Sequence, residues 1–115
     1  MLEALWSVEF FNPNGGISTG AGMVVLETGR ILGGDSMYYY VGDYSVDGKK
    51  VTAKVRVTHY NWLPLSIFGN LTEFFLDLSG EIDQNSPKSF FLHGNISGQP
   101  NNQIVIKFTR RAELP

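Results

Sequence analysis

Apolar and polar residues alternate one by one along most of this chain, and this period of two constrains the fold more than any other feature. The clearest stretch, 51–58, alternates apolar with polar residues in the order Val51, Thr52, Ala53, Lys54, Val55, Arg56, Val57, Thr58. Successive side chains of a strand point to opposite faces, so this stretch predicts a strand with one buried and one solvated face. The pattern is typical of β-structure rather than of helices.

The same alternation predicts about eight strands, at 5–11, 18–27, 30–34, 37–46, 49–59, 72–82, 89–98 and 103–111. The connections are mostly short and rich in turn-forming residues, too short for a parallel crossover, so neighbouring strands should be antiparallel. Closing such a meander on itself removes its two exposed edges. Because 115 residues suit one domain, we predict that residues 1–115 form a single all-β domain, an antiparallel up-and-down barrel.

Two hairpins can be aligned residue by residue. Asp47-Gly48 is predicted to be a two-residue turn, because Asp-Gly suits positive φ. The resulting register places four pairs on one face: Tyr44 with Val51, Gly42 with Ala53, Tyr40 with Val55 and Tyr38 with Val57. A second turn at Thr28-Gly29 pairs the strands on either side of it, with Leu26 opposite Ile31 and Val24 opposite Gly33.

Segment 60–71 breaks the alternation and is too apolar for a free loop, with Trp62, Leu63, Ile67 and Phe68. We expect a short helical turn or flap over one barrel mouth, with an ordinary packed loop as an equal alternative.

Glycine occupies several positions on the predicted inward face: Gly20, Gly22, Gly33, Gly42, Gly80, Gly94 and Gly98. The favoured explanation is the tight curvature of a small barrel, and the alternative is space for one small apolar ligand. The residues predicted to line such a ligand cavity are Trp6, Tyr38, Tyr40, Val55, Val57, Phe74 and Phe108.

Some large apolar residues fall on the outward face. Phe75 and Phe91 lie on neighbouring predicted strands, with Val105 on the strand after them. Outward aromatic residues on adjacent strands suggest an interface, although single exposed apolar residues are common. We therefore expect a homodimer or partner surface at these three residues.

Residues that could carry catalysis or hold a metal are scattered. There is no cysteine, and His59 and His93 do not form a metal-spaced pair. The acids Glu73, Asp77 and Glu81 share an outward face, whereas a catalytic pair of carboxylates would need to lie inward and shielded from water. We therefore expect them to form part of a solvated face. We predict no catalytic residue, metal or cofactor, with an enzyme using His59 as a minor alternative.

The net charge is −2, and the nine Lys and Arg residues form no basic stripe, so nucleic acid is not an expected partner. No apolar run reaches the roughly 20 residues of a membrane helix, and the N-terminus does not resemble a secretory signal. These features lead us to expect a cytoplasmic bacterial protein.

Three segments, 31–36, 40–42 and 55–61, resemble in order and spacing the GrlR-type negative regulators of bacterial type III secretion. The resemblance implies a lipocalin-like eight-stranded barrel, a homodimer, repression through a transcriptional activator protein, and a hydrophobic interior for a lipid-like ligand. The best-known member carries alternating acids in one hairpin. Here that hairpin, 45–50, has one acid, Asp47, followed by two lysines, so the activator-binding role that the resemblance implies for those acids does not carry over to this chain.

Two functional hypotheses follow. The first is a non-enzymatic regulatory binding protein that acts through protein contacts. In this hypothesis an apolar ligand in the barrel can tune those contacts. The second is a carrier of a small lipid-like molecule. A barrel is compatible with many functions, so the first hypothesis depends on analogy.

Overall fold

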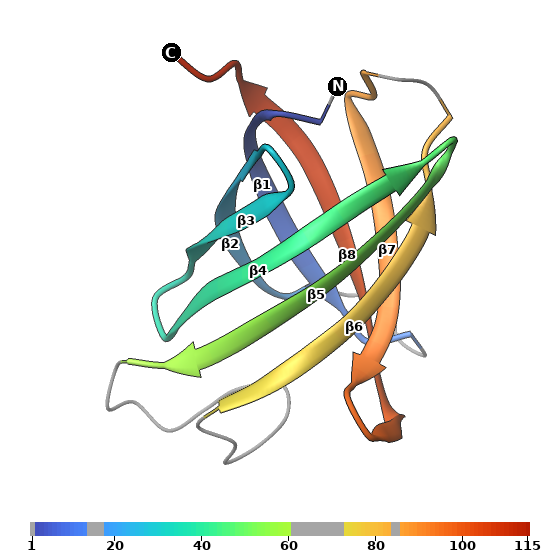
Figure 1. Cartoon of the computed structure of the whole chain (residues 1–115). Coiled ribbons are helices and arrows are strands. Elements are labelled where there is room, and N and C mark those ends of the chain that lie inside the picture. The colour runs from blue at the N-terminus through green and yellow to red at the C-terminus, as the bar shows by residue number, and fades with distance from the viewer. Residues whose placement is uncertain (1, 14–17, 61–72, 84–85) are drawn as a thin grey trace.

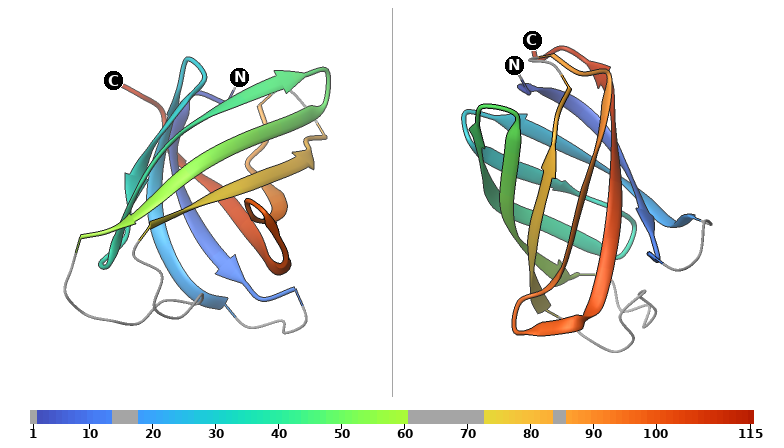
Figure 2. Two further views of the ribbon diagram at one scale, coloured as in Figure 1. Left: turned by 60° about the horizontal axis from the view of Figure 1, so that its bottom comes forward. Right: turned by 90° about the vertical axis from the view of Figure 1, so that its right-hand side faces the viewer.

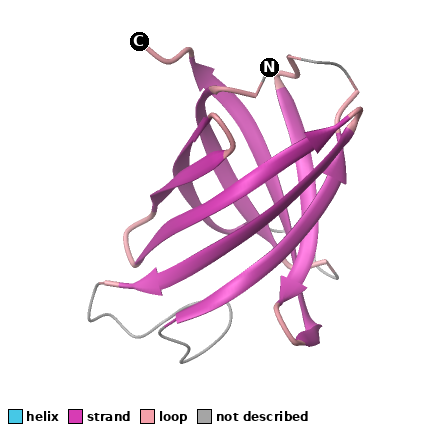
Figure 3. Cartoon of the chain, viewed as in Figure 1, coloured by secondary structure: helices cyan, strands magenta, loops and turns pink. Residues whose placement is uncertain are grey.

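The computed structural model describes residues 2–13, 18–60, 73–83 and 86–115. Eight strands follow one another along the chain: β1 (Ala4–Phe11), β2 (Ser18–Glu27), β3 (Arg30–Gly34), β4 (Tyr38–Asp47), β5 (Lys50–His59), β6 (Glu73–Glu81), β7 (Ser89–Ile96) and β8 (Gln99–Ala112) (Figure 1). The described part of the chain consists of strands and loops (Figure 3).

Each strand pairs antiparallel with the next, and β8 returns to pair with β1, so the sheet closes into a barrel. Figure 2 shows this wall from two further sides. The prediction of an eight-stranded antiparallel up-and-down barrel is confirmed. Closure gives both edge strands a partner and removes a template for edge-to-edge aggregation. The predicted flap at 60–71 lies, apart from Tyr60, outside the described residues.

The β2–β3 hairpin has the predicted register, with Leu26 opposite Ile31. Its turn residues Thr28 and Gly29 both have positive φ, +50° and +79°. Two positive φ values are the requirement of a type I′ turn, whose twist matches that of the flanking strands.

The predicted register of the β4–β5 hairpin is wrong by two residues. The closing pair is Asp47 with Lys50, and the turn is Gly48-Lys49 instead of Asp47-Gly48. Gly48 has φ +62° and stands first in the turn, as a type II′ turn favours. Tyr40 consequently pairs with Val57. A slip of two residues preserves the face of every side chain, so the predicted inward face survives the error.

The turn between β7 and β8 also differs from the expectation. The predicted strands 89–98 and 103–111 leave 99–102 as a loop, but β8 begins at Gln99 and the turn lies at Ser97-Gly98. Gly98 has φ +78°. The register shifts between Asn95 and Ile96, so a bulge absorbs the extra residues of β8.

The two ends of the barrel differ in their connections. The β2–β3 and β4–β5 turns lie at the end that also carries both chain termini (Figures 1 and 2), which we call the terminal end. The β3–β4 connection, residues 35–37, lies at the opposite end, which we call the mouth end.

Aromatic side chains fill the terminal end of the barrel. Trp6 is fully buried, and its ring meets Phe90 edge to face at a centroid distance of 4.9 Å. Phe90 stacks on Phe108 at 4.6 Å, and the guanidinium of Arg110 lies 4.7 Å from the Trp6 ring centroid. The indole nitrogen of Trp6 donates to the Leu2 carbonyl oxygen at 2.8 Å, so its one polar atom is satisfied. This packed layer closes the interior at that end.

Candidate functional site

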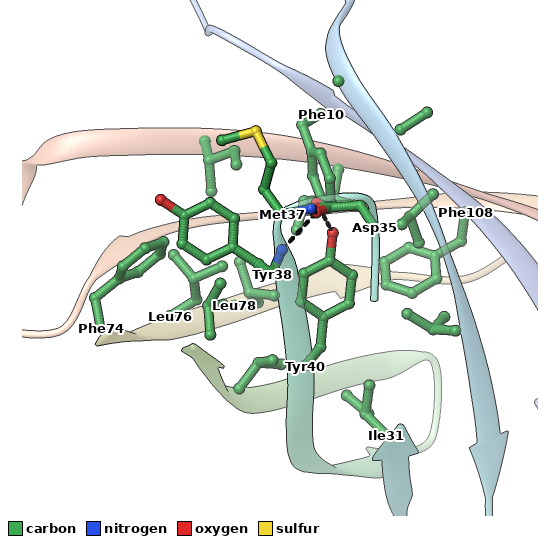
Figure 4. A pocket seen from close by; sticks show the side chains of 18 of the residues that line it. Phe10, Ile31, Asp35, Met37, Tyr38, Tyr40, Phe74, Leu76, Leu78 and Phe108 are labelled. Carbon is green, nitrogen blue, oxygen red and sulfur yellow. Dashed lines mark hydrogen bonds between the residues drawn. The ribbon is translucent and has the colours of Figure 1, made fainter. Parts of the chain in front are cut away.

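The mouth half of the barrel contains a cavity of about 270 Å³. Its wall is made almost entirely of apolar side chains from most of the strands: Val8, Phe10, Val24, Ile31, Met37, Tyr38, Tyr40, Val55, Val57, Phe74, Leu76, Leu78, Ile104, Ile106 and Phe108, with Gly20, Ala21, Asp35 and Ser36 beside them. Figure 4 shows several of these side chains converging from different strands. Such a space suits one small, largely apolar molecule.

Most of the residues predicted to line a cavity do line it: Tyr38, Tyr40, Val55, Val57, Phe74 and Phe108. Trp6 does not, because it belongs to the packed layer at the terminal end. Phe108 both lines the cavity and stacks on Phe90, so it forms part of the cavity floor. Alternation placed Trp6 on the inward face correctly, but it carries no information about depth along the barrel axis.

The inward glycines serve two purposes. At Gly33 and Gly42 an added Cβ would lie 2.1 Å and 2.2 Å from backbone oxygens of the neighbouring strands, so these glycines permit close approach and curvature. At Gly20 the nearest atom to an added Cβ is a Phe10 ring carbon at 3.5 Å, an ordinary contact. Curvature therefore explains Gly33 and Gly42, and Gly20 leaves space in the cavity wall.

One carboxylate, that of Asp35, stands in this apolar wall. Its Oδ1 accepts hydrogen bonds from the backbone N–H groups of Met37 and Tyr38, each at 2.8 Å. Its Oδ2 accepts a hydrogen bond from the Tyr40 hydroxyl (Figure 4). The Asp35 backbone N–H donates to the Tyr38 carbonyl oxygen at 2.8 Å, which closes the β3–β4 connection. Asp35 thus holds the turn and also presents charge beside the cavity.

Sequence reasoning missed Asp35 as a site residue. The available signal was an Asp directly after Gly33-Gly34, because Asp often hydrogen-bonds the backbone two residues ahead in a turn. That signal predicts the turn, but it cannot show that Tyr40 reaches the second carboxylate oxygen.

Tyr40 is held as a hydrogen-bond donor. Burial away from water raises the pKa of its hydroxyl well above the usual 10.0, and the hydrogen bond to Asp35 and the charge of Asp35 raise it further. The Phe10 ring packs edge to face on Tyr40 at 5.9 Å. Gly22 makes room for the Asp35–Tyr40 pair, since an added Cβ there would lie 3.0 Å from the Tyr40 hydroxyl.

The two histidines lie on strands that are not neighbours. His59 ends β5 near the mouth end, and its ring lies against that of Tyr38 at 5.1 Å. His93 is exposed on β7, opposite Val105. Among the described residues, no group of three or more His, Cys, Asp or Glu side chains could hold a metal ion.

The structure does not bring together the three residues predicted to form an outer surface. Phe75 and Phe91 are 41% and 51% exposed on neighbouring strands. The Phe75 carbonyl oxygen accepts a backbone hydrogen bond from Ser97, so Phe75 lies beside Ser97 on β7. Phe91 lies six residues before Ser97 on that strand, so Phe75 and Phe91 are roughly 20 Å apart along the strand direction. Val105 is half-buried and lies diagonally from Phe91, which pairs with Lys107.

A different apolar row crosses the outer wall. Leu5, Val25, Leu32 and Val41 face one another in register on β1 to β4. Leu32, in the middle, is 46% exposed, and the other three are half-buried. Asp47 lies elsewhere, exposed at the tip of the β4–β5 hairpin.

No protein-family model matches the chain, and no curated protein matches it either. Within the described residues, no helix has the length and apolarity needed to cross a membrane.

Proposed function

We propose that this protein is a non-enzymatic binding protein that takes one small, largely apolar molecule into the mouth half of its barrel. The observation that carries the proposal is the cavity of about 270 Å³ between the mouth end and the Phe108 floor. Proteins normally fill their interiors to the density of organic crystals. A space of this size in so small a barrel reduces packing, and a bound ligand would restore it.

Native mass spectrometry of protein purified gently without detergent tests this proposal. The expected result is one small molecule per chain, or uptake of an added amphiphile at the same ratio. Gly20→Leu should abolish uptake, because the new side chain extends into the cavity from a position that accommodates a Cβ. Ser89→Leu, at an exposed position of β7, is the matched control. Equal uptake by the two variants, or none by the original protein, would contradict the proposal.

A second candidate function is regulation through protein contacts, as the resemblance to type III secretion regulators implies. The apolar row Leu5, Val25, Leu32 and Val41 supports it, because contiguous exposed apolar surface often marks an interface. A homodimer or a transcriptional activator in the bacterial cytoplasm would then cover this row. The cavity could tune such contacts when a ligand occupies it.

Light scattering and pull-down of the tagged chain test the second candidate. Leu32→Lys should shift the molecule to a monomer or release its protein partner, because burying an unpaired charge at an interface is costly. Ser89→Lys places the same charge on β7, four strands away around the barrel, and should have no effect. Identical behaviour of both variants would argue against this surface.

A further inference from the structure

We propose that the ligand carries a hydrogen-bond donor, preferably a protonated amine, at the end that meets Asp35. This inference rests on the proposed ligand-binding function and names the class of ligand. It is carried by the placement of the Asp35 carboxylate in a wall whose described residues include no basic side chain.

The first step concerns the hydrogen-bonding capacity of Asp35. An ionised carboxylate has about four acceptor sites. The two backbone N–H groups that reach Oδ1 and the Tyr40 hydroxyl that reaches Oδ2 occupy three of them. One site on Oδ2 is left, and Asp35 and Tyr40 both line the cavity. A donor on a bound ligand can occupy this remaining site.

The second step concerns charge. The described residues that line the cavity include no Lys, Arg or His. All nine Lys and Arg residues of the chain are described, and Lys54, Arg56 and Lys107, which alternate with cavity residues along β5 and β8, fall on the outward face. Lys54 lies over the Phe75 ring, and Lys107 lies over the Phe91 ring. Arg110 is occupied at the terminal end beside Trp6. An anionic headgroup at Asp35 would therefore meet a like charge without a compensating cation.

The third step concerns Tyr40. A free tyrosine hydroxyl near the mouth could donate to a ligand carboxylate. Here the Tyr40 hydrogen is already directed at Asp35 Oδ2. The Tyr60 hydroxyl is also engaged, since it donates to the Asp35 carbonyl oxygen at 2.6 Å. The hydroxyl oxygens of Tyr40 and Tyr60 are therefore left to accept a hydrogen bond from a ligand, and this again favours a donor headgroup.

Isothermal titration calorimetry of the full chain with three matched ligands tests the inference. Decylamine, decanol and decanoate share the alkyl chain and differ in the headgroup, which is cationic, neutral and anionic near neutral pH. We expect decylamine to bind most tightly and decanoate most weakly, with at least about a tenfold difference, because a charge-assisted hydrogen bond contributes roughly twice a neutral one.

Asp35→Asn removes the charge and keeps a side-chain oxygen for the N–H groups of Met37 and Tyr38. It should reduce decylamine affinity by about tenfold or more and leave decanol affinity within a few-fold. Asp43→Asn makes the same change at an exposed position of β4 and should leave the ranking intact. The ranking in the unaltered protein stands as evidence even if Asp35→Asn does not fold.

The outcomes separate the two proposals. If none of the three ligands binds, the ligand-binding function fails and this inference fails with it. If all three bind but decanoate equals or exceeds decylamine, the cavity binds ligands and the donor-headgroup inference is overturned. An unchanged ranking in folded Asp35→Asn would also overturn it.

Discussion

Tyr40 donates a hydrogen bond from its phenolic hydroxyl to the carboxylate of Asp35, five positions earlier in the chain and across the β3–β4 connection. The same carboxylate accepts two backbone N–H groups of that connection. One side chain therefore organises the turn, while the other ties the turn to the cavity wall. The stability of this end of the barrel and the polarity of the cavity consequently depend on one pair.

Tyr40→Phe should lower the free energy of unfolding by about 1–2 kcal/mol, because it removes the donor and leaves Asp35 Oδ2 without this partner. Urea denaturation followed by fluorescence measures the change. Tyr39→Phe is the matched control, since Tyr39 is the next residue on β4 but points outward. It should change stability by less than about 0.5 kcal/mol. Equal effects at both positions would contradict a stabilising Asp35–Tyr40 pair.

Stability at high pH should depend on Tyr40. Its pKa is raised in the folded protein, so the stability linked to its proton is fully present below the ordinary pKa of 10.0. Above that pH the unfolded chain loses the proton and the folded protein keeps it, so the free energy of unfolding falls.

Urea denaturation from pH 9 to 12 should therefore show a steeper decline for the original protein than for Tyr40→Phe, by up to about 1.4 kcal/mol per pH unit. Tyr44, whose pKa is also raised by burial, remains in both proteins, so the difference reports Tyr40. Parallel curves would show that Tyr40 titrates normally in the folded state.

Phe90 and Phe91 are consecutive residues of one type on opposite faces of β7. Phe90 is 5% exposed and packs on Trp6 and Phe108, whereas Phe91 is 51% exposed. Phe90→Ala should cost about 3–5 kcal/mol of stability through lost burial and a new cavity. Phe91→Ala should cost less than about 1 kcal/mol, because the side chain is half exposed. Thermal or urea unfolding of the two variants compares the losses. Similar losses at the two positions would contradict the assignment of Phe90 to the buried face and Phe91 to the exposed face of β7.

Gly42→Ala and Gly20→Ala make the same change at two inward positions with different surroundings. At Gly42 the new Cβ would lie 2.2 Å from the Lys54 carbonyl oxygen. Relieving this clash would require the backbone of β5 to move, which costs stability. We expect a loss of about 1–3 kcal/mol or more there. At Gly20 the closest atom is at 3.5 Å, so the loss should be below about 1 kcal/mol. Circular dichroism melts of both variants check the order, and the reverse order would contradict this account of the glycines.

The amino-acid sequence by itself determined which residues face inward. Val55 and Val57 were predicted to share a face with Tyr38 and Tyr40, and all four are buried. This inference survived a two-residue error in the β4–β5 register, because the side-chain period of a strand is also two. Alternation is local, so it can be read from the chain without knowing which strands are neighbours. The up-and-down closure of the barrel could be predicted because most of the connections are short.

Only the tertiary structure decided where along the barrel each inward residue lies. It placed Trp6 in the packed terminal end and Phe108 at the cavity floor, and it set Phe75 far from Phe91. It also brought the Tyr40 hydroxyl to the Asp35 carboxylate. Depth and cross-strand neighbours depend on the stagger of all eight strands around a closed ring. That stagger is a property of the whole sheet, so no single segment of the chain encodes it.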